Sequence, residues 1–214
     1  MARPPQPRYV LVSYLRLEPQ QLDWVSNILC GPRLSDSRHP RSLLRDPAGN
    51  RLLELTAFDE LSNVDELLAG PAFHEITLAL RPRLGAGFRR QLYEVDEVVK
   101  APVFVPSAAP YLRLTRMEVA QSALDQYVGW RKRSLFPHAA QHPGVAAFVA
   151  YQPVVSTEPG MLFLSAFSSP ENGTLESTPE YSEWIREAGE RYALGGSNAI
   201  STSVWQRHWL STST

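Results

Sequence analysis

The stretch YVLVSYLRL at residues 9–17 is rich in β-branched, aromatic and aliphatic residues, and a similar stretch, YLRLTRMEV, follows at residues 111–119. Both stretches are typical of β-strands. The segments of the second half lie 102 to 109 residues after their partners, so the sequence predicts one structural unit present twice. Two further pairs occur in the same order, namely LELTAF (53–58) with LFLSAF (162–167) and GPAFHEI (70–76) with TPEYSEW (178–184).

Each half is predicted to follow the order β-α-β-β-α-β. The first helix is expected around residues 19–29 in the first half and, longer, from residue 124 in the second, where apolar residues recur at helical spacing. The second helix of each half is expected to begin at a proline, Pro71 or Pro179, because the first helical position needs no backbone N–H. A closing strand is expected near residues 92–99 and again near 200–209.

This order is that of the ferredoxin-like unit, whose sheet carries helices on one face only. The bare face needs a cover, and a second copy of the same sheet supplies it. We therefore predict an α+β fold of two tandem ferredoxin-like units packed sheet to sheet as an α+β barrel. The predicted units span residues 1–100 and 111–214, with a linker rich in Pro and Ala at 101–110.

Composition excludes several classes of protein. The chain has 214 residues, a formal net charge of −1, five His and one Cys. A single Cys cannot form an internal disulfide, and no Cys/His group has the spacing of a zinc site, so no metal is expected. The balanced charge argues against a nucleic-acid partner. Without an apolar stretch of about 20 residues or a signal peptide, the expectation is a cytoplasmic protein with no membrane contact.

Short motifs add a family resemblance. HPGV (142–145) precedes a predicted strand, the segment 161–167 follows it, and the helix openings PAFH (71–74) and TPEYSEW (178–184) match in kind. With these motifs the sequence resembles the antibiotic-biosynthesis monooxygenases of the dimeric α+β barrel superfamily, with two protomers fused in one chain. The first half departs from the pattern, because it has His39-Pro40 where the second half has Pro143-Gly144.

The resemblance implies an oxygenase that oxidises a polycyclic phenolic substrate, an aromatic polyketide of antibiotic biosynthesis, with O2. One similar subgroup, the angucycline B-ring-opening oxygenases, cleaves a carbon–carbon bond in a Baeyer–Villiger-like step with reduced flavin. Three alternatives remain open. They are a cofactor-independent monooxygenase that converts an anthrone or phenol into a quinone, a polyketide cyclase, and a non-catalytic barrel that binds a ligand.

The cofactor expected from the resemblance is reduced flavin, FADH2 or FMNH2, or none. The sequence has no Rossmann or P-loop signature, so flavin would bind as a diffusible cosubstrate supplied by a flavin reductase. Arg131 and Arg133, in the basic segment WRKR (130–133), are the candidates to hold its pyrophosphate, and a solvated helix face is the alternative. A homodimer also stays open, although duplication within the chain could replace dimerisation.

The substrate pocket is expected between the helices and the sheet, where a flat aromatic ring would stack on aromatic side chains. Arg113 is a candidate anchor for an anionic substrate, with a structural ion pair as the alternative. For the aromatic candidates the alternative is a place in the core. These candidates are Trp130, Phe148, Phe163, Tyr181, Trp184 and Trp205.

Three histidines are candidate acid–base groups, since His titrates near neutral pH. His138 and His142 follow the long helix, and either could remove a phenolic proton and so activate the ring toward oxygen. Pro137 and Pro143 argue against a helix in this stretch, which predicts a loop. His74 begins the second helix of the first half. The alternative for all three is an exposed surface histidine.

Overall fold

The computed structural model describes residues 7–31, 39–47, 49–84, 88–101, 104–155, 160–169 and 178–211. The chain divides into two compact units, Met1–Glu94 with Trp205–Thr214 and Val95–Val204. Two long strands, β4 (Phe88–Lys100) and β8 (Ile200–Ser211), contribute residues to both units.

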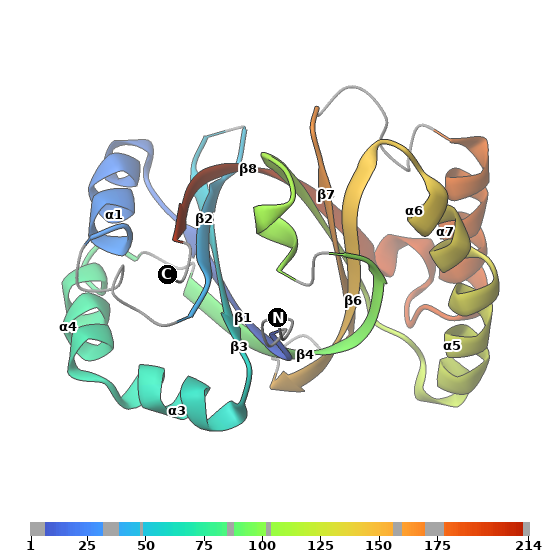
Figure 1. The fold of residues 1–214 in the computed structure, drawn as a ribbon, viewed down its shortest axis with the longest axis horizontal. Coiled ribbons are helices and arrows are strands. Elements are labelled where there is room, and N and C mark those ends of the chain that lie inside the picture. Colours follow the sequence, from blue (N-terminus) through green and yellow to red (C-terminus); the bar gives the residue numbers. More distant parts are fainter. Residues whose placement is uncertain are drawn as a thin grey trace, which may run out of the picture. The chain divides into compact units, whose positions relative to one another are not determined.

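The first unit is a mixed α+β structure in which helices cover one face of antiparallel strands (Figure 1). Strand β1 lies between β3 and the first part of β4, and β3 pairs in turn with β2. The helical side of this unit is filled mainly by leucines, including Leu15, Leu29 and Leu80. Its other elements are β1 (Tyr9–Arg16), α1 (Leu22–Leu29), β2 (Arg41–Arg45), β3 (Arg51–Phe58), α3 (Leu61–Ala69) and α4 (Pro71–Leu80).

The second unit repeats this plan. Strand β5 pairs with β7, and β7 pairs with β6, both antiparallel, while the helices of this unit lie on one side of the strands (Figure 1). Its core is aromatic where that of the first unit is aliphatic, with Tyr127, Trp130 and Phe148 among the buried residues. The elements are β5 (Tyr111–Met117), α5 (Leu124–Arg133), α6 (Leu135–Gln141), β6 (Val145–Val155), β7 (Met161–Phe167) and α7 (Pro179–Arg191).

The strand order confirms the predicted fold class. Hydrogen bonding connects the strands as β1-β3-β2-β8-β5-β7-β6-β4, in a closed barrel. Within this order the runs β4-β1-β3-β2 and β8-β5-β7-β6 are equivalent, which is the order expected of a ferredoxin-like unit present twice. The pairing register agrees with the sequence repeat, which matches Ser13 with Thr115 and Glu54 with Phe163. Ser13 stands opposite Glu54 in the first unit, and Thr115 stands opposite Phe163 in the second.

The region around His138 differs from the prediction. Residues Leu135–Gln141 form helix α6, and His138 lies within it, whereas the sequence predicted a loop. Pro137 is the third residue of this helix, and the first backbone N–H groups of a helix have no partner within the helix. Proline at that position therefore removes no helical hydrogen bond, and the loop prediction was wrong.

The first unit contains a helix that the sequence pattern did not indicate. Helix α3 precedes α4, and the two are separated by Gly70 alone. The start of α3 is a reciprocal cap, in which the Glu60 side chain accepts from the backbone of Asn63 and the Asn63 side chain accepts from the Glu60 N–H. Helices α4 and α7 begin at Pro71 and Pro179, as predicted.

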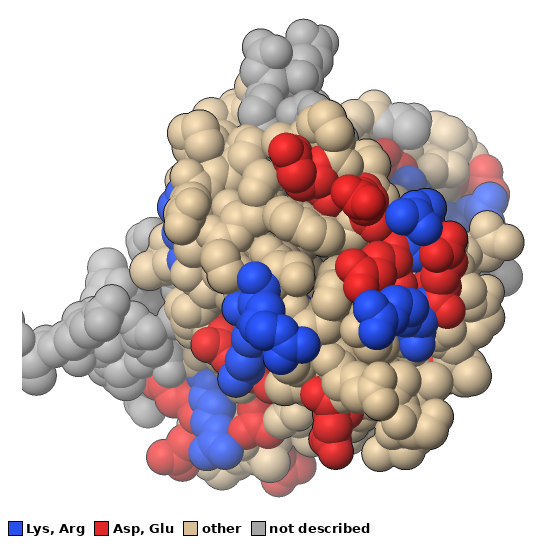
Figure 2. Space-filling model, turned by 90° about the vertical axis from the view of Figure 1, so that its right-hand side faces the viewer, with Lys and Arg blue, Asp and Glu red and all other residues tan. Residues whose placement is uncertain are grey.

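Charges of both signs alternate on the outer face of the second unit's helices (Figure 2). On α7, Arg186 and Arg191 pair with glutamates one turn away, at 2.9 Å to Glu190 and 2.7 Å to Glu187. Such exposed pairs contribute little to stability, on the order of 0.5 kcal/mol each. None of the described helices is both long and apolar enough to span a bilayer.

Candidate functional site

A pocket lies in the second unit, between helices α5, α6 and α7 and the sheet. About 480 Å³ of space lies between its lining atoms, including the part open to solvent. Only a small part of that space is wide enough for a water molecule, so a ligand with several rings must displace a lining side chain. The lining is Thr115, Met117, Tyr127, Trp130, Leu135, Phe148, Phe163, Ser165, Tyr181, Trp184, Ile185, Ala188 and Ile200.

Strand alternation supplies the floor of this pocket. Side chains two residues apart share a face of a strand, so Thr115 joins Met117 on β5 and Phe163 joins Ser165 on β7. Thr115 stands opposite Phe163 in the register, and Ser165 stands opposite Phe148 of β6. The floor is therefore a continuous surface made by three adjacent strands.

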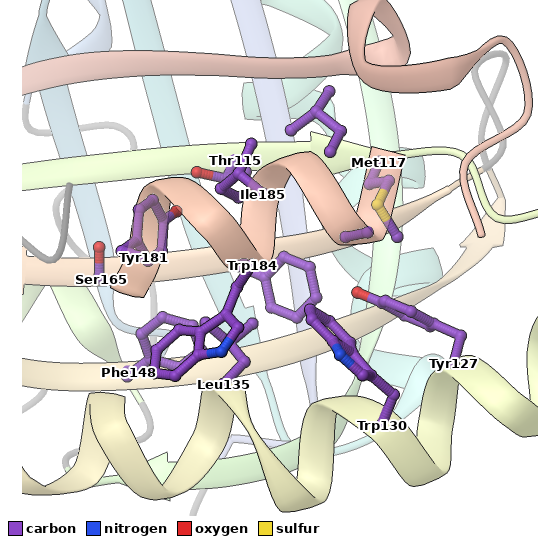
Figure 3. A pocket seen from close by; sticks show the side chains of 13 residues that line it. Thr115, Met117, Tyr127, Trp130, Leu135, Phe148, Ser165, Tyr181, Trp184 and Ile185 are labelled. Atoms are coloured by element: carbon purple, nitrogen blue, oxygen red, sulfur yellow. The ribbon is translucent and has the colours of Figure 1, made fainter. Parts of the chain in front are cut away.

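Helical spacing supplies the walls. Tyr181, Trp184, Ile185 and Ala188 recur at three- and four-residue steps along α7, so they face the sheet together. Tyr127 and the side chain of Trp130 extend from α5 toward the same space (Figure 3). Helix α7 is fixed at its start by the Thr178 hydroxyl, which accepts from the Tyr181 N–H at 3.3 Å.

The aromatic side chains hold one another in place. Tyr127 stacks on Trp130 with ring centroids 5.9 Å apart, and Tyr192 packs against both rings. Phe148 lies 5.9 Å from Phe163. Aromatic pairs at such separations add roughly 0.5–1.5 kcal/mol each beyond the area they bury. The buried part of the wall is therefore held by contacts among its own aromatic rings.

Trp184 differs from the other aromatic lining residues, which are all buried, because it is partly exposed. Its ring meets the His138 ring edge-on, with centroids 4.8 Å apart. Among the aromatic lining residues, Trp184 is therefore the one least enclosed by the protein. His138 is one of the contacts that hold it.

Few polar groups reach the pocket. The Thr115 hydroxyl is hydrogen-bonded to that of Thr202 at 3.2 Å. Burial raises the pKa of the Tyr127 hydroxyl well above its ordinary value, so this group is a neutral phenol at physiological pH and can donate a hydrogen bond. The lining contains no carboxylate and no imidazole among the residues described.

His138 and His142 lie close together beside the pocket, with ring centroids 5.6 Å apart, but neither lines it. The Nε2 atom of His138 is 3.4 Å from the Thr178 hydroxyl at the start of α7. Nδ1 of His142 accepts a hydrogen bond from the backbone N–H of Gly144 at 3.2 Å. His138 thus contacts Trp184 and the start of α7, while His142 contacts His138 and the turn that precedes β6.

The pKa of His142 is lowered, first by partial burial and then by the nearby His138 and Lys100. The Lys100 ammonium donates to the backbone carbonyl of His142 at 2.9 Å, which brings its charge close. Protonation of His142 at Nδ1 would also place an N–H donor opposite the Gly144 N–H and remove the hydrogen bond that Nδ1 now accepts. His142 is therefore neutral at physiological pH.

The basic segment of α5 does not form an anion clamp in the part of the chain that the structure describes. Arg131 is 1% exposed and forms an ion pair with Asp96 of β4, and its guanidinium lies 5.5 Å from the Tyr127 ring centroid. Lys132 pairs with Glu97 at 3.1 Å, and Arg133 is exposed. A buried Arg131 and an exposed Arg133 do not converge on one group, so these two residues do not fit a flavin pyrophosphate.

The remaining predicted residues lie outside the pocket lining. Arg113 is buried opposite Ser165, at one end of the pocket, with its guanidinium 5.1 Å from the Phe167 ring centroid. Trp205 belongs to the first unit, where it packs edge-on against Tyr14. His74 is an exposed residue of α4 in the first unit. These three do not join the five aromatic candidates that line the pocket.

Several lining residues were not singled out from the sequence. Tyr127 and Leu135 belong to the stretch after residue 124 whose apolar residues recur at helical spacing, which predicts a helix face but not a pocket. The register that brings Thr115 beside Ser165 depends on strand pairing. The one available signal was strand alternation, which places Ser165 on the same face of its strand as Phe163. The described residues hold no group of three or more His, Cys, Asp or Glu side chains placed to bind a metal ion.

The first unit carries different residues at the equivalent positions. Arg41 of β2 stands opposite Thr56 as Phe148 stands opposite Ser165, and Glu54 takes the place of Phe163. Arg41 and Glu54 form a buried ion pair, and the Trp209 ring lies 5.7 Å from the Arg41 guanidinium. The first unit therefore has a buried ion pair where the second has aromatic pocket residues.

Comparison with known proteins places the fold. No protein-family model matches the chain, and no curated protein matches its sequence. Among solved structures, an anthrone oxidase-like protein superimposes with a TM-score of 0.71 at 12% identity, covering 97% of this chain and 94% of the other. A candidate monooxygenase from Lactobacillus acidophilus NCFM gives a TM-score of 0.66 at 15% identity, covering 97% of both chains.

A structure named as a regulator is also similar. A major regulator of staphylococcal pathogenesis is similar over 93% of this chain and 98% of its own, with a TM-score of 0.58 at 8% identity. Identities this low establish a shared architecture and leave activity to be argued from the site. The chain thus has the α+β barrel fold found in monooxygenase-like and anthrone oxidase-like proteins.

Proposed function

We propose that the chain is a monooxygenase that uses O2 to oxidise a flat, phenolic or enolisable aromatic compound of the polycyclic polyketide class. The observation that carries the proposal is the pocket of the second unit, which combines stacked aromatic walls with a few polar groups. Such a lining suits a ring system that stacks and is oriented by one or two hydrogen bonds. The fold it shares with monooxygenase-like structures supports the proposal.

In the proposed reaction the ring methylene of an anthrone and one molecule of O2 give a ring carbonyl and one molecule of water. The substrate loses a proton to give a delocalised enolate, which passes one electron to O2, and the two radicals combine to form a carbon–peroxide bond. Cleavage of the O–O bond with loss of the second methylene hydrogen leaves the quinone and water. The substrate supplies all four electrons, so no external reductant enters the balance.

The protein's part is to position the ring, exclude water and stabilise the enolate oxygen. The hydroxyl of Tyr127 remains protonated and is available to donate to a developing oxyanion. The lining offers no base of its own among the described residues. His138 becomes reachable when Trp184 turns aside to admit the ring, and it is our proposed acceptor of the first proton.

A flavin-dependent form of the reaction, with a reductase as partner, is the second candidate named by the resemblance. Its predicted anchor residues do not support it, because Arg131 is committed to Asp96 and Arg133 lies at the surface. We therefore derive no step through flavin and propose no ring opening. Oxygen uptake measured with and without a flavin reductase system separates the two forms.

The test uses anthrone as the probe and measures O2 consumption together with quinone formation. We expect turnover without flavin, and Trp184→Ala should lower kcat/KM by roughly tenfold or more through loss of a stacking wall. Trp24→Ala is the matched control, since Trp24 is an exposed tryptophan of α1 in the first unit, and it should retain full activity. Equal rates in the two variants would contradict the assignment of this pocket.

Two other outcomes overturn the proposal in distinct ways. Turnover that depends on reduced flavin would restore the flavin-dependent form. Binding of anthrone without consumption of O2 under either condition would favour a non-catalytic barrel that binds a ligand.

A further inference from the structure

The indole N–H of Trp130 is a buried donor in the wall of the pocket. Trp130 is only 6% exposed, and its Nε1 atom is buried with no hydrogen-bond acceptor among the residues that the structure describes. The same residue lines the pocket, with its side chain directed from α5 into the space between α5 and α7 (Figure 3). Buried Trp N–H groups usually have a partner, and leaving one unpaired costs on the order of 1–3 kcal/mol.

The position of Trp130 is held by its neighbours. Its ring stacks on Tyr127 at 5.9 Å and packs against Tyr192 at 5.5 Å, so the indole cannot rotate freely to seek an acceptor elsewhere. The Thr115 hydroxyl on the pocket floor is already hydrogen-bonded to the Thr202 hydroxyl. A ligand in the pocket is therefore the natural acceptor for this donor.

We infer that Trp130 recognises the substrate by donating a hydrogen bond from Nε1 to an oxygen of the bound ring system. The inference rests on the proposed function and narrows its substrate class to compounds with a carbonyl or phenolate oxygen on the edge that faces α5. In the reaction above this oxygen is the one that becomes negatively charged in the enolate. The Trp130 N–H then acts as a substrate-binding group whose bond strengthens as charge develops.

The decisive comparison uses two ligands with the same three-ring carbon framework, anthrone and 9,10-dihydroanthracene, which lacks the carbonyl oxygen. Binding is measured without O2, by calorimetry, so the result does not depend on turnover. We expect anthrone to bind more tightly than dihydroanthracene, and Trp130→Phe to weaken anthrone binding roughly three- to tenfold while leaving dihydroanthracene nearly unchanged. Trp184→Phe is the matched control and should weaken both ligands equally.

A second readout separates donation from packing. In protein labelled with 15N at tryptophan, the indole N–H resonance absent from Trp130→Phe identifies Trp130, and it should move downfield with anthrone and less with dihydroanthracene. Equal losses for both ligands in Trp130→Phe, an unmoved indole resonance, or binding of neither ligand would overturn the inference. Anthrone binding with these signatures but no O2 consumption would uphold the inference and contradict only the oxygenase proposal.

Discussion

At the residue scale, burial decides which side chains have chemistry to offer. Arg131 resembles an exposed basic residue in the sequence, because it lies in the run WRKR, yet it is among the most buried side chains of the protein. Its charge is balanced by Asp96, a residue that lies on another element. Sequence patterns identify five of the aromatic residues that line the pocket, but not Tyr127, and they do not show which charged residue has a partner across the fold.

His142 leads to a prediction about pH. Its pKa is lower in the folded chain than the ordinary value of about 6.5, so below that value the unfolded chain binds more protons than the folded one. Stability contributed by neutral His142 is present above pH 6.5 and decreases as the pH falls toward the folded pKa. Urea unfolding at about pH 7.5 and about pH 5.5 should show a smaller pH-dependent loss for His142→Asn than for the parent chain. An identical loss in both proteins would contradict the account.

At the scale of elements, the strands and the proline-started helices α4 and α7 were predictable, because alternation and the N–H-free first position are local properties. Helices α3 and α6 were not. The first begins with a cap between Glu60 and Asn63 that lies in no apolar pattern, and the second tolerates Pro137 only because it starts at Leu135. Sequence periodicity does not locate the first residue of a helix to within two residues.

The packing of α7 on the 3-10 turn Gly196–Ala199 gives a prediction for Gly189. A Cβ atom at this position would lie 2.5 Å from the Cα of Ser197, so Gly189→Ala should lower the free energy of unfolding by about 1–3 kcal/mol. At Gly129 of α5 the nearest atom is the flexible Arg133 Nη1 at 3.1 Å, and Gly129→Ala should be neutral or stabilise by about 0.4–1 kcal/mol. Urea denaturation checks both, and equal effects would refute the close approach at Gly189.

At the scale of the whole molecule, the repeat conserves architecture while the two units differ in what they enclose. Val25 and Ile28 stand on α1 where Tyr127 and Trp130 stand on α5, and the Arg41–Glu54 pair stands where Phe148 and Phe163 lie. Removing one partner of a buried ion pair typically costs about 3–5 kcal/mol, because the other charge stays buried without a partner. A flat apolar ligand that separated Arg41 from Glu54 would meet a similar cost. We therefore propose that the ligand binds in the second unit and not at the equivalent described residues of the first.

A crystal structure of the chain with anthrone, grown without O2, tests this claim most directly. We expect one anthrone per chain, stacked among Trp130, Trp184 and Phe163, with Trp184 turned from its present position and the carbonyl oxygen within hydrogen-bond distance of Trp130 Nε1. Anthrone bound in the first unit beside Arg41 and Glu54, or bound in both units alike, would contradict the account.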